Sequence, residues 1–499
     1  MSVDLTTEPS RGTEPSWEHR RGGRWTPDVP APVIGLLAAL VGVMIGLFGG
    51  TGTSNLPLVT FVCAPTQVAT FIVLRNHILK RSKSLCIAIG FSWLVYFTFR
   101  LLLTQYDRQN PNEQEFVRAA GDDAFIWAWY ISTIALIGFA LGAAFIGAGK
   151  PSRRYVPDLS VKTLMWFAVV GLLGRTGMVF GGINSGFIEN IMSLYLLAFA
   201  ALGYHSVTMP EIRPKLYTLV GVASSLGILT SFKEAAIIPI VALAVGISSA
   251  GFKIGKGTMA TLVAAGLMMF LTIQGNRVAF DEGDSIPLYE APLVAFTTYD
   301  FEAGVTAEPD RTFLEANSQI VKGMSRRFGG VTSIVILYER VPEHNEHLGG
   351  RSLWQPAVSA IPVVSGYFDL EFRVLSMGRY FTQTFMAPDQ PDNASSQAIT
   401  MLGDFWLNFG DAGVFIGFVI WGLAIGKLDR MFPPITATRV GAMVYLGHIL
   451  IGVERNVAFL GVNAAIRLTV LLLVLRGVAR WGDAEGPTKQ MLGQASGRR

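Results

Sequence analysis

Apolar stretches long enough to cross a membrane recur along almost the whole sequence, and short polar connections separate them. A helix needs about 20 mostly apolar residues to span the roughly 30 Å hydrocarbon core of a bilayer. Only 15% of the residues are charged, whereas a typical soluble domain has about 25%. The sequence therefore predicts an all-α, polytopic integral membrane protein. Its charge distribution gives no sign of a nucleic-acid-binding surface.

We predict twelve crossings, with Lys and Arg concentrated in alternate connections. Cytoplasmic connections carry an excess of these residues, which places both termini in the cytoplasm. The Gly-x-x-x-Gly steps Gly138/Gly142 and Gly422/Gly426 indicate close packing between helices. The crossings cover approximately residues 32–50, 55–74, 84–104, 124–147, 159–180, 186–205, 215–231, 235–250, 258–274, 407–427, 437–453 and 460–476.

The predicted organisation includes one large extracytoplasmic loop, because a structureless segment of that length would be unusual in a compact protein. A helical pattern with Phe313 and Met324 on its apolar face ends at Arg326 and Arg327, and it predicts an amphipathic helix on the membrane. The regions are a disordered cytoplasmic tail at 1–30, crossings one to nine at 31–274, the loop at 275–405, crossings ten to twelve at 406–476, and a second tail at 477–499.

One adjacent pair of opposite charges, Lys233 and Glu234, interrupts the apolar run from Gly227 to Gly246. Residues 215–250 are predicted to form a helical hairpin, with this pair at its extracytoplasmic bend. The pair is either a solvated turn whose lysine reaches toward water or a cation at the mouth of an outward-facing site. Spacing alone leaves both interpretations open.

Several cations fall in the outer half of the predicted topology. Arg467 interrupts an apolar segment, and an arginine in that setting usually faces the bundle interior or a polar cavity. Each cation alone is explained by anchoring or by a nearby carboxylate, but together they indicate an anion site, because guanidinium groups match phosphate oxygens. The group consists of Arg175, Lys233, Arg277, Arg326, Arg327, Arg351, Arg455 and Arg467.

Metal binding is not expected from this sequence. His344 and His347 have a spacing that could bind a metal on a helix, but Pro342 and the glycines that follow predict a loop there. The cysteines, Cys63 and Cys86, lie in apolar segments and indicate neither a disulfide framework nor a zinc site. No Asp-rich motif suggests bound magnesium, so no cofactor is predicted.

The segment GDFWLNFGDAGVFIGFVIWGLAIG, Gly403–Gly426, resembles a stretch of the bacterial oligosaccharide repeat-unit polymerases, the O-antigen polymerase family. In that family a Gly-Glu-x-Tyr-x-Asn-Phe-Gly stretch opens a late transmembrane helix. Asp404 stands where glutamate is usual and Trp406 where tyrosine is usual. The matching positions are Asn408, Phe409 and Gly410.

Two further stretches are similar to the family, and the resemblance covers roughly Leu159 to Arg476. The turn TSFKEA, which contains Lys233, looks like the Gly-Ser-Lys/Arg turn between two short helices. The segment RRFGGVTSIVILYERVPEHNEHLGGRSL looks like the arginine-containing helix with its Pro turn and following glycine. The Pro-Arg and Trp-Pro-x-Lys-Pro stretches that often follow in the family are absent from SAIPVVSGYFDLEF.

The resemblance implies a metal-independent glycosyltransferase with a fold of the GT-C-like class, in the bacterial cytoplasmic (inner) membrane. Such an enzyme joins polyprenyl-pyrophosphate-linked oligosaccharides, for O-antigen, capsule or exopolysaccharide synthesis. Flippase and chain-length regulator proteins are the partners that it implies, besides membrane lipid.

The reaction that the resemblance implies needs charge stabilisation for the departing pyrophosphate and a proton acceptor for the acceptor hydroxyl. Asp404 could instead cap a helix. Our hypothesis assigns the pyrophosphate to Lys233, Arg326, Arg327 and Arg455, with Arg277 and Arg467 as weaker candidates, and the proton to Asp404, Glu234 or His344.

Two alternative functions stay open. An O-antigen ligase or another polyprenyl-lipid-dependent glycosyltransferase has a similar topology, and a ligase would transfer the glycan to lipid A core. A polysaccharide or lipid-linked-sugar transporter belongs to a different class. Transporters often contain inverted repeats with broken helices near the membrane midplane, and the two halves of this sequence show no clear duplication.

Overall fold

The computed structural model describes most of the helical part of the chain. The predicted crossings at 32–50 and 258–274, and the candidate residues Arg277, Arg326 and Arg327, lie outside the described residues. The described ranges are 55–78, 85–107, 120–147, 158–181, 186–229, 233–252, 255, 299–300, 305–306, 331–344, 347–359, 367–368, 370, 377–386, 399–431, 436–453, 455–480 and 484–485.

Helices account for nearly all of these residues. In chain order they are α2 (Leu56–Val73), the π-helical turn η1 (Leu74–Ile78), α3 (Leu85–Trp93), the π-helical η2 (Leu94–Phe99), α4 (Arg100–Asp107), α6 (Asp122–Gly147), α7 (Val161–Gly181), α8 (Gly186–Met192), α9 (Leu194–His205), the 3₁₀ turn η3 (Pro210–Ile212), α10 (Arg213–Leu229), α11 (Lys233–Ser249), α15 (Val331–His344), α16 (Arg351–Ser359), α17 (Met377–Phe381), the π-helical η5 (Thr382–Met386), α18 (Met401–Met431), α19 (Ala437–Leu450) and α20 (Val457–Arg480).

Four two-residue strands complete the described structure. β1 (Asp158–Leu159) pairs antiparallel with β4 (Ala484–Glu485), which places the start of α7 beside the residues that follow α20. β2 (Tyr299–Asp300) pairs antiparallel with β3 (Val305–Thr306).

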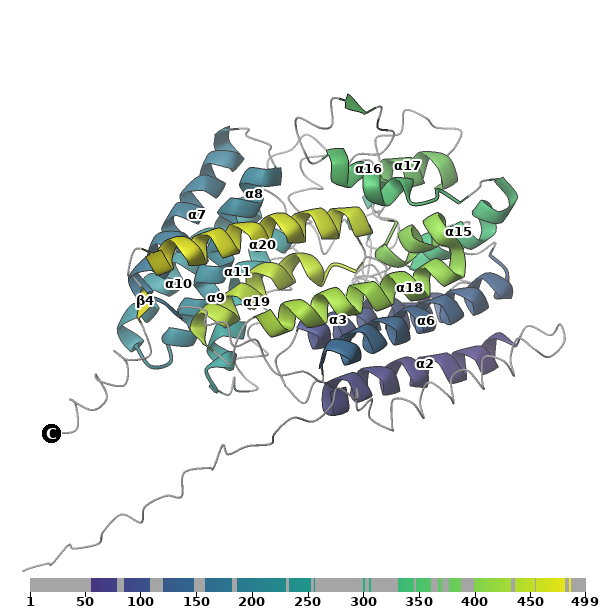
Figure 1. The fold of residues 1–499 in the computed structure, drawn as a ribbon, viewed down its shortest axis with the longest axis horizontal. Coiled ribbons are helices and arrows are strands. Elements are labelled where there is room, and N and C mark those ends of the chain that lie inside the picture. The colour runs from purple at the N-terminus through teal and green to yellow at the C-terminus, as the bar shows by residue number, and fades with distance from the viewer. Residues whose placement is uncertain are drawn as a thin grey trace, which may run out of the picture.

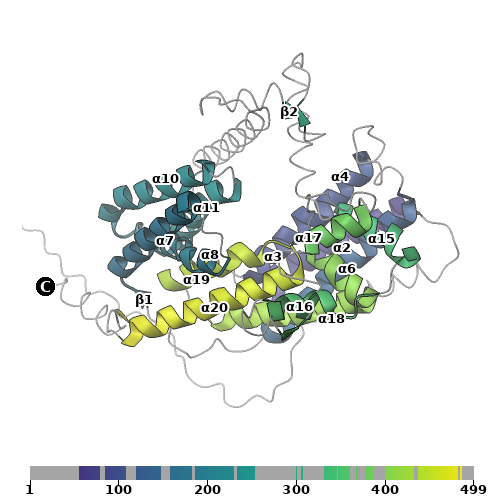
Figure 2. The same cartoon turned by 90° about the horizontal axis from the view of Figure 1, so that it is seen from above.

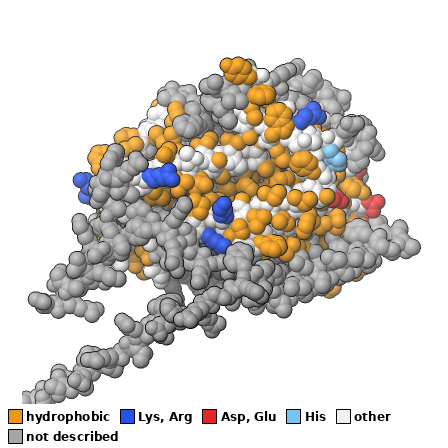
Figure 3. Space-filling view, viewed as in Figure 1, with side chains coloured by type: hydrophobic (Ala, Val, Ile, Leu, Met, Phe, Trp, Pro, Cys, Tyr) orange, Lys and Arg blue, Asp and Glu red, His pale blue; other side chains and the backbone are white. Residues whose placement is uncertain are grey.

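This chain is a helical membrane protein. Five of the described helical segments are long and apolar enough to cross a bilayer. Apolar side chains spread over the face seen in Figure 3, and large ones such as Phe61 and Leu173 are well exposed, as expected of helices that face lipid. The five segments are Leu56–Asn76, Leu85–Gln105, Asp122–Ile146, Met401–Met431 and Val457–Val478.

Each of the ten predicted crossings that fall in the described residues coincides with helical structure. Two details differ from the predictions. α18 begins at Met401, inside the predicted loop, because Thr400 adopts a φ of 59° and its hydroxyl accepts a hydrogen bond from Gly403 N–H at 3.1 Å. The prediction of a loop at His344 is wrong: α15 continues through Pro342 to His344, although proline has no N–H to donate to the carbonyl group four residues earlier.

Two groups of helices lie on either side of α19 and α20. Figure 1 shows α2, α6 and α18 side by side, and Figure 2 shows α7, α10 and α11 gathered away from them. At one end of the bundle Asp429, near the end of α18, accepts from Leu85 N–H at the start of α3 at 2.9 Å. At the other end Met401 N–H donates to Val453 O at 3.2 Å. Both contacts join helix ends that the predicted topology assigns to the same side.

Glycines bring α6 and α18 into backbone contact, which confirms the predicted Gly-x-x-x-Gly packing. A Cβ atom at Gly142 would overlap the carbonyl oxygen of Val419, and one at Gly422 would overlap the carbonyl oxygen of Phe139. Close approach of this kind supplies van der Waals contact in lipid, where no hydrophobic driving force exists between helices.

The Gly142→Ala variant should therefore unfold more easily than the wild-type protein. Overpacking a tight contact costs about 1–3 kcal/mol, because α6 and α18 must separate to admit the methyl group. Gly177→Ala is the matched control, since a Cβ there meets nothing within 4 Å. Thermal unfolding of both purified variants in detergent measures the difference, and equal midpoints would show that the helix contact is not tight.

Candidate functional site

A buried polar network surrounds Asp404 near the start of α18. The Asp404 carboxylate accepts hydrogen bonds from the Ser352 hydroxyl at 2.5 Å, from the Asn408 amide at 3.1 Å and from Val457 N–H at 2.9 Å. Asp404 is fully buried. The network joins three helices, because Ser352 belongs to α16 and Val457 is the first residue of α20. Asp404 therefore caps a helix distant in sequence, not the one that contains it.

A break in α18 explains why the residues before α16 pack against this network. Gly410 has φ 66° and ψ −161° inside the helix, a conformation that glycine adopts without strain. The break frees carbonyl groups in the preceding turn, and N–H groups ahead of α16 bind them: Leu348 N–H donates to Leu407 O at 3.0 Å. Gly350 N–H donates to the Asn408 side-chain oxygen at 2.9 Å.

Two capping groups fix the start of α20 and with it the position of Arg455. Asn456 accepts from Phe459 N–H at 2.7 Å, and Asp404 accepts from Val457 N–H. Arg455 is half-buried, and its guanidinium lies 4.8 Å from the centre of the Phe459 ring. The cation is thus held just before the start of α20, and part of its side chain stays exposed.

Arg467 is the centre of a second polar cluster, deeper along α20. Its guanidinium donates to the Asn190 side-chain oxygen at 2.8 Å, to Tyr445 O at 2.7 Å and to Ser193 Oγ at 3.3 Å. It also lies 3.0 Å from His448 Nδ1, which is the acceptor because a guanidinium only donates. Arg467 is 1% exposed, and these four protein groups occupy most of its five N–H donors.

Arg175 joins this cluster from α7. Its guanidinium donates to the Tyr195 hydroxyl, and it is half-buried. Arg175 and Arg467 lie near each other, because their partners Tyr195 and Ser193 are two residues apart at the start of α9. Arg455 stands just before α20, the helix that carries Arg467, and Arg175 was not among the predicted site residues.

A row of aromatic rings lies near the starts of α6 and α18 and along the second half of α15. Trp406 packs edge-on against Trp127 at 4.8 Å and against His347 at 5.7 Å, and Trp127 continues to Tyr338 at 5.2 Å between ring centres. Both indole N–H groups donate to Asp411, at 2.8 Å from Trp406 and 3.4 Å from Trp127. Trp and Tyr gather at membrane–water interfaces, which fits this position at the helix ends.

The environment of Tyr338 favours its protonated form. Burial raises the pKa of Tyr338 above its usual range, and the negative charges of Asp123 and Glu339 raise it further. The phenol is therefore a hydrogen-bond donor at neutral pH.

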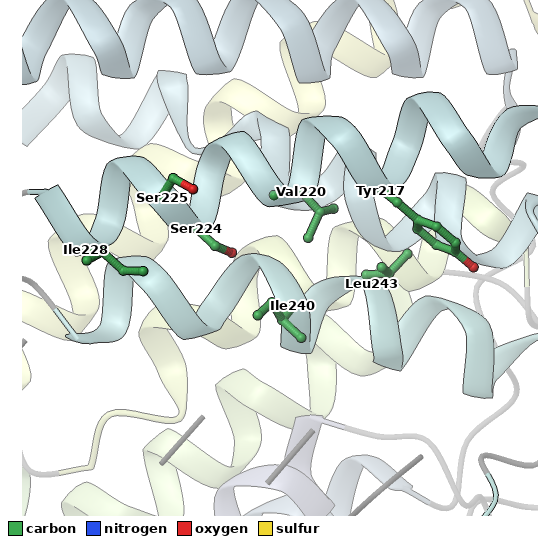
Figure 4. Close-up of a pocket in the computed structure, with 8 residues that line it drawn as sticks. Tyr217, Val220, Ser224, Ser225, Ile228, Ile240 and Leu243 are labelled. Carbon is green, nitrogen blue, oxygen red and sulfur yellow. The ribbon is translucent and has the colours of Figure 1, made fainter. Parts of the chain in front are cut away.

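The predicted helical hairpin at 215–250 is confirmed as α10 and α11. A Cβ atom at Gly227 would overlap the backbone of Ala236, so the two helices touch near their connection. Below that contact they separate around an open groove of about 370 Å³ (Figure 4). Tyr217, Val220, Ser224, Ile228, Ile240 and Leu243 are among the residues that line it.

Of the nine predicted site residues, the structure describes three with their side chains, three only as backbone and three not at all. Asp404, Arg455 and Arg467 are described with their side chains and lie along the contact of α18, α19 and α20. The backbone of Lys233 and Glu234 begins α11, and His344 ends α15. The side chains of these three, and Arg277, Arg326 and Arg327 altogether, lie outside the description.

No protein-family model, curated protein or solved structure matches this chain. The resemblance to oligosaccharide repeat-unit polymerases stays a prediction. Among the residues that the structure describes, no group of three or more His, Cys, Asp or Glu side chains is placed to hold a metal ion.

Proposed function

We propose that this protein is a glycosyltransferase that joins polyprenyl-pyrophosphate-linked oligosaccharides at the outer face of the bacterial cytoplasmic membrane. The observation that carries the proposal is that Arg175 and Arg467 bind Tyr195 and Ser193, neighbouring residues at the start of α9, while the half-buried Arg455 stands just before the helix that carries Arg467. Arginines within a membrane-spanning bundle are rare, and they often mark the path of a substrate or an ion. A pyrophosphate attached to a lipid reaches such a site from within the membrane.

In the proposed reaction the hydroxyl group of an acceptor glycan attacks the anomeric carbon of the donor. The bond between that carbon and the pyrophosphate oxygen breaks, and polyprenyl pyrophosphate leaves with the electron pair. Arg175 and Arg455, both half-buried, are the cations that we assign to its developing negative charge. Arg467 holds the surrounding polar groups in place without touching the substrate.

Lys233 is the further cation that we assign to this site. Gly203 of α9 and Leu243 of α11 lie against each other. Lys233 is the first residue of α11, and Ser193, a partner of Arg467, immediately precedes α9. The predicted topology assigns both residues to the outer half of the bundle, which is the basis of this assignment.

The proposed role of Asp404 is to position Arg455. Its carboxylate is fully buried and three protein donors occupy it, so an acceptor hydroxyl does not reach it. Glu234, adjacent to Lys233 at the start of α11, is the base that we propose for the acceptor proton.

Chain growth by the purified protein tests the proposal. Incubation in nanodiscs with synthetic polyprenyl-pyrophosphate repeats should give dimers and longer products by mass spectrometry. Arg455→Ala should lower the rate by about 10²–10³, the usual cost of removing one group that stabilises developing negative charge. Arg476→Ala is the matched control, because Arg476 is exposed near the other end of α20.

The outcomes separate the rival functions. Absence of joined repeats with the wild-type protein, or an unchanged rate with Arg455→Ala, would refute the proposal. Transfer of single repeats to lipid A core would identify a ligase, and movement of the lipid-linked repeat across liposomes without chain growth would identify a transporter.

A further inference from the structure

The imidazole ring of His448 has no role in the function proposed above. His448 belongs to the last turn of α19, and its Nδ1 atom lies 3.0 Å from Nη1 of Arg467 on α20. The two helices lie side by side (Figure 1), and Figure 2 shows the same neighbourhood from above. A guanidinium has only donors, so Nδ1 accepts and carries no proton. The contact therefore fixes the tautomer of His448, with the proton of the ring on Nε2.

The same contact restricts the chemistry of this ring. A second proton would have to enter at Nδ1, where it would face the N–H group of Arg467 and place two cations side by side. Loss of the Nε2 proton would leave an imidazolate anion, which does not form at neutral pH. His448 is therefore a hydrogen-bond donor at Nε2, and it is neither a general base nor a general acid.

The Nε2–H group of His448 is open to a ligand. The side chain is half-buried. In the part of the chain that the structure describes, no residue hydrogen-bonds to Nε2, and Nε2 is not among the enclosed polar atoms without a partner. This nitrogen therefore lies at an accessible surface. Hydrocarbon cannot accept its hydrogen bond, so a polar group is the partner that it requires.

The charges around His448 favour an anionic partner. Arg467 lies on the Nδ1 side of the ring. Arg455 follows seven residues later, after a connection that turns back on itself, because Arg455 N–H donates to Gly452 O at 3.0 Å. A group at Nε2 is thus placed near two guanidinium charges. Phosphate oxygens suit this setting, since they accept short, charge-assisted hydrogen bonds.

We infer that the Nε2–H group of His448 donates a hydrogen bond to an oxygen of the substrate pyrophosphate. This hydrogen bond stabilises the negative charge that develops as the bond to the anomeric carbon breaks, and it moves no proton. Arg467 is the positioning residue, because its contact with Nδ1 sets the tautomer of the ring. The inference rests on the proposed function for the identity of the phosphate-bearing substrate.

Two amide variants separate this role from a structural one. In His448→Asn the amide oxygen stands near the position of Nδ1 and can accept from Arg467, but no donor stands near the position of Nε2. In His448→Gln the amide N–H stands near the position of Nε2, but Arg467 loses an acceptor. Chain growth per folded protein should fall at least tenfold in His448→Asn and should fall less in His448→Gln, with thermal unfolding as the measure of folding. Equal losses, or the opposite order, would make His448 a structural acceptor for Arg467 and overturn the inference.

A spectroscopic test needs no acceptor glycan. Purified full-length protein in phosphatidylcholine nanodiscs is isotopically labelled at its histidine nitrogens, and the His448→Asn variant identifies the His448 signals by their loss. In the nuclear magnetic resonance spectrum Nε2 should be protonated, and inorganic pyrophosphate should shift the signal of its proton. A protonated Nδ1, or an Nε2–H signal that pyrophosphate leaves unchanged, would overturn the inference. If pyrophosphate shifts the signal but the protein joins no repeats, the proposed function fails and the donor role of His448 stands.

Discussion

Replacing Asp404 with alanine is expected to lower the free energy of unfolding by about 4 kcal/mol, since each buried donor left without an acceptor costs about 1–3 kcal/mol. The Ser352 hydroxyl, the Asn408 amide and Val457 N–H would lose their common acceptor. Chemical unfolding of the purified protein in detergent, followed by circular dichroism, measures the change. Because Val457 begins α20, the same variant should also reduce chain growth through Arg455.

Asp411→Ala is the control for this prediction. Asp411 accepts hydrogen bonds from two indole N–H groups, but its side chain is exposed. In the Asp411→Ala variant water can accept these hydrogen bonds, so the free energy of unfolding should fall by only about 1 kcal/mol. Asp404→Asn keeps the size of the side chain and one acceptor oxygen, so its loss in the free energy of unfolding should fall between those of Asp404→Ala and Asp411→Ala. Equal losses from Asp404→Ala and Asp411→Ala would show that the buried network contributes little.

The second large effect is expected at Arg467. Arg467→Ala should destabilise the protein by about 3–5 kcal/mol, because it leaves a cavity in place of a side chain that is 1% exposed. It also removes the donor from the Asn190 oxygen, Tyr445 O and Ser193. Arg467→Lys keeps the charge but offers a compact ammonium in place of a planar fork, so it should recover only part of the stability.

Comparison with Arg455 separates positioning from substrate binding. Arg455→Ala should reduce chain growth with little change in the free energy of unfolding. Arg467→Ala should lower both the rate of chain growth and the free energy of unfolding. Arg476→Ala, an exposed arginine on the same helix, should change neither. A stable Arg467→Ala protein with wild-type chain growth would contradict the role assigned to this cluster.

The helices were predicted well because each is a run of apolar residues whose length is visible in the sequence without knowledge of distant contacts. The hairpin of α10 and α11 and close packing at the Gly-x-x-x-Gly steps were expected from residue spacing, but the spacing did not show that α6 and α18 are partners. The ends of helices were less predictable. α18 starts earlier than predicted, where the Thr400 hydroxyl accepts a hydrogen bond from Gly403 N–H, and α15 continues through Pro342, where the sequence predicted a loop.

The candidate site was predicted through its charges but not through their neutral partners. Arg467 was recognised because a cation in an apolar segment is rare. Asn190 interrupts another apolar segment in the same way, and this signal could have placed it beside Arg467. Tyr445 and Ser352 gave no such signal, since a tyrosine or serine is common in helices and only the fold brings them to their partners.

The hydrogen bond between Asp404 and Val457 N–H has a consequence for biosynthesis. The acceptor is made some fifty residues before its donor, which belongs to α20, the last of the described helices. The Asn190 side-chain oxygen is likewise made long before its donor, Arg467 of the same helix. A nascent chain that stops before α20 would expose unpaired polar groups in two places, which gives the cell's membrane proteases a chemical mark of incomplete insertion.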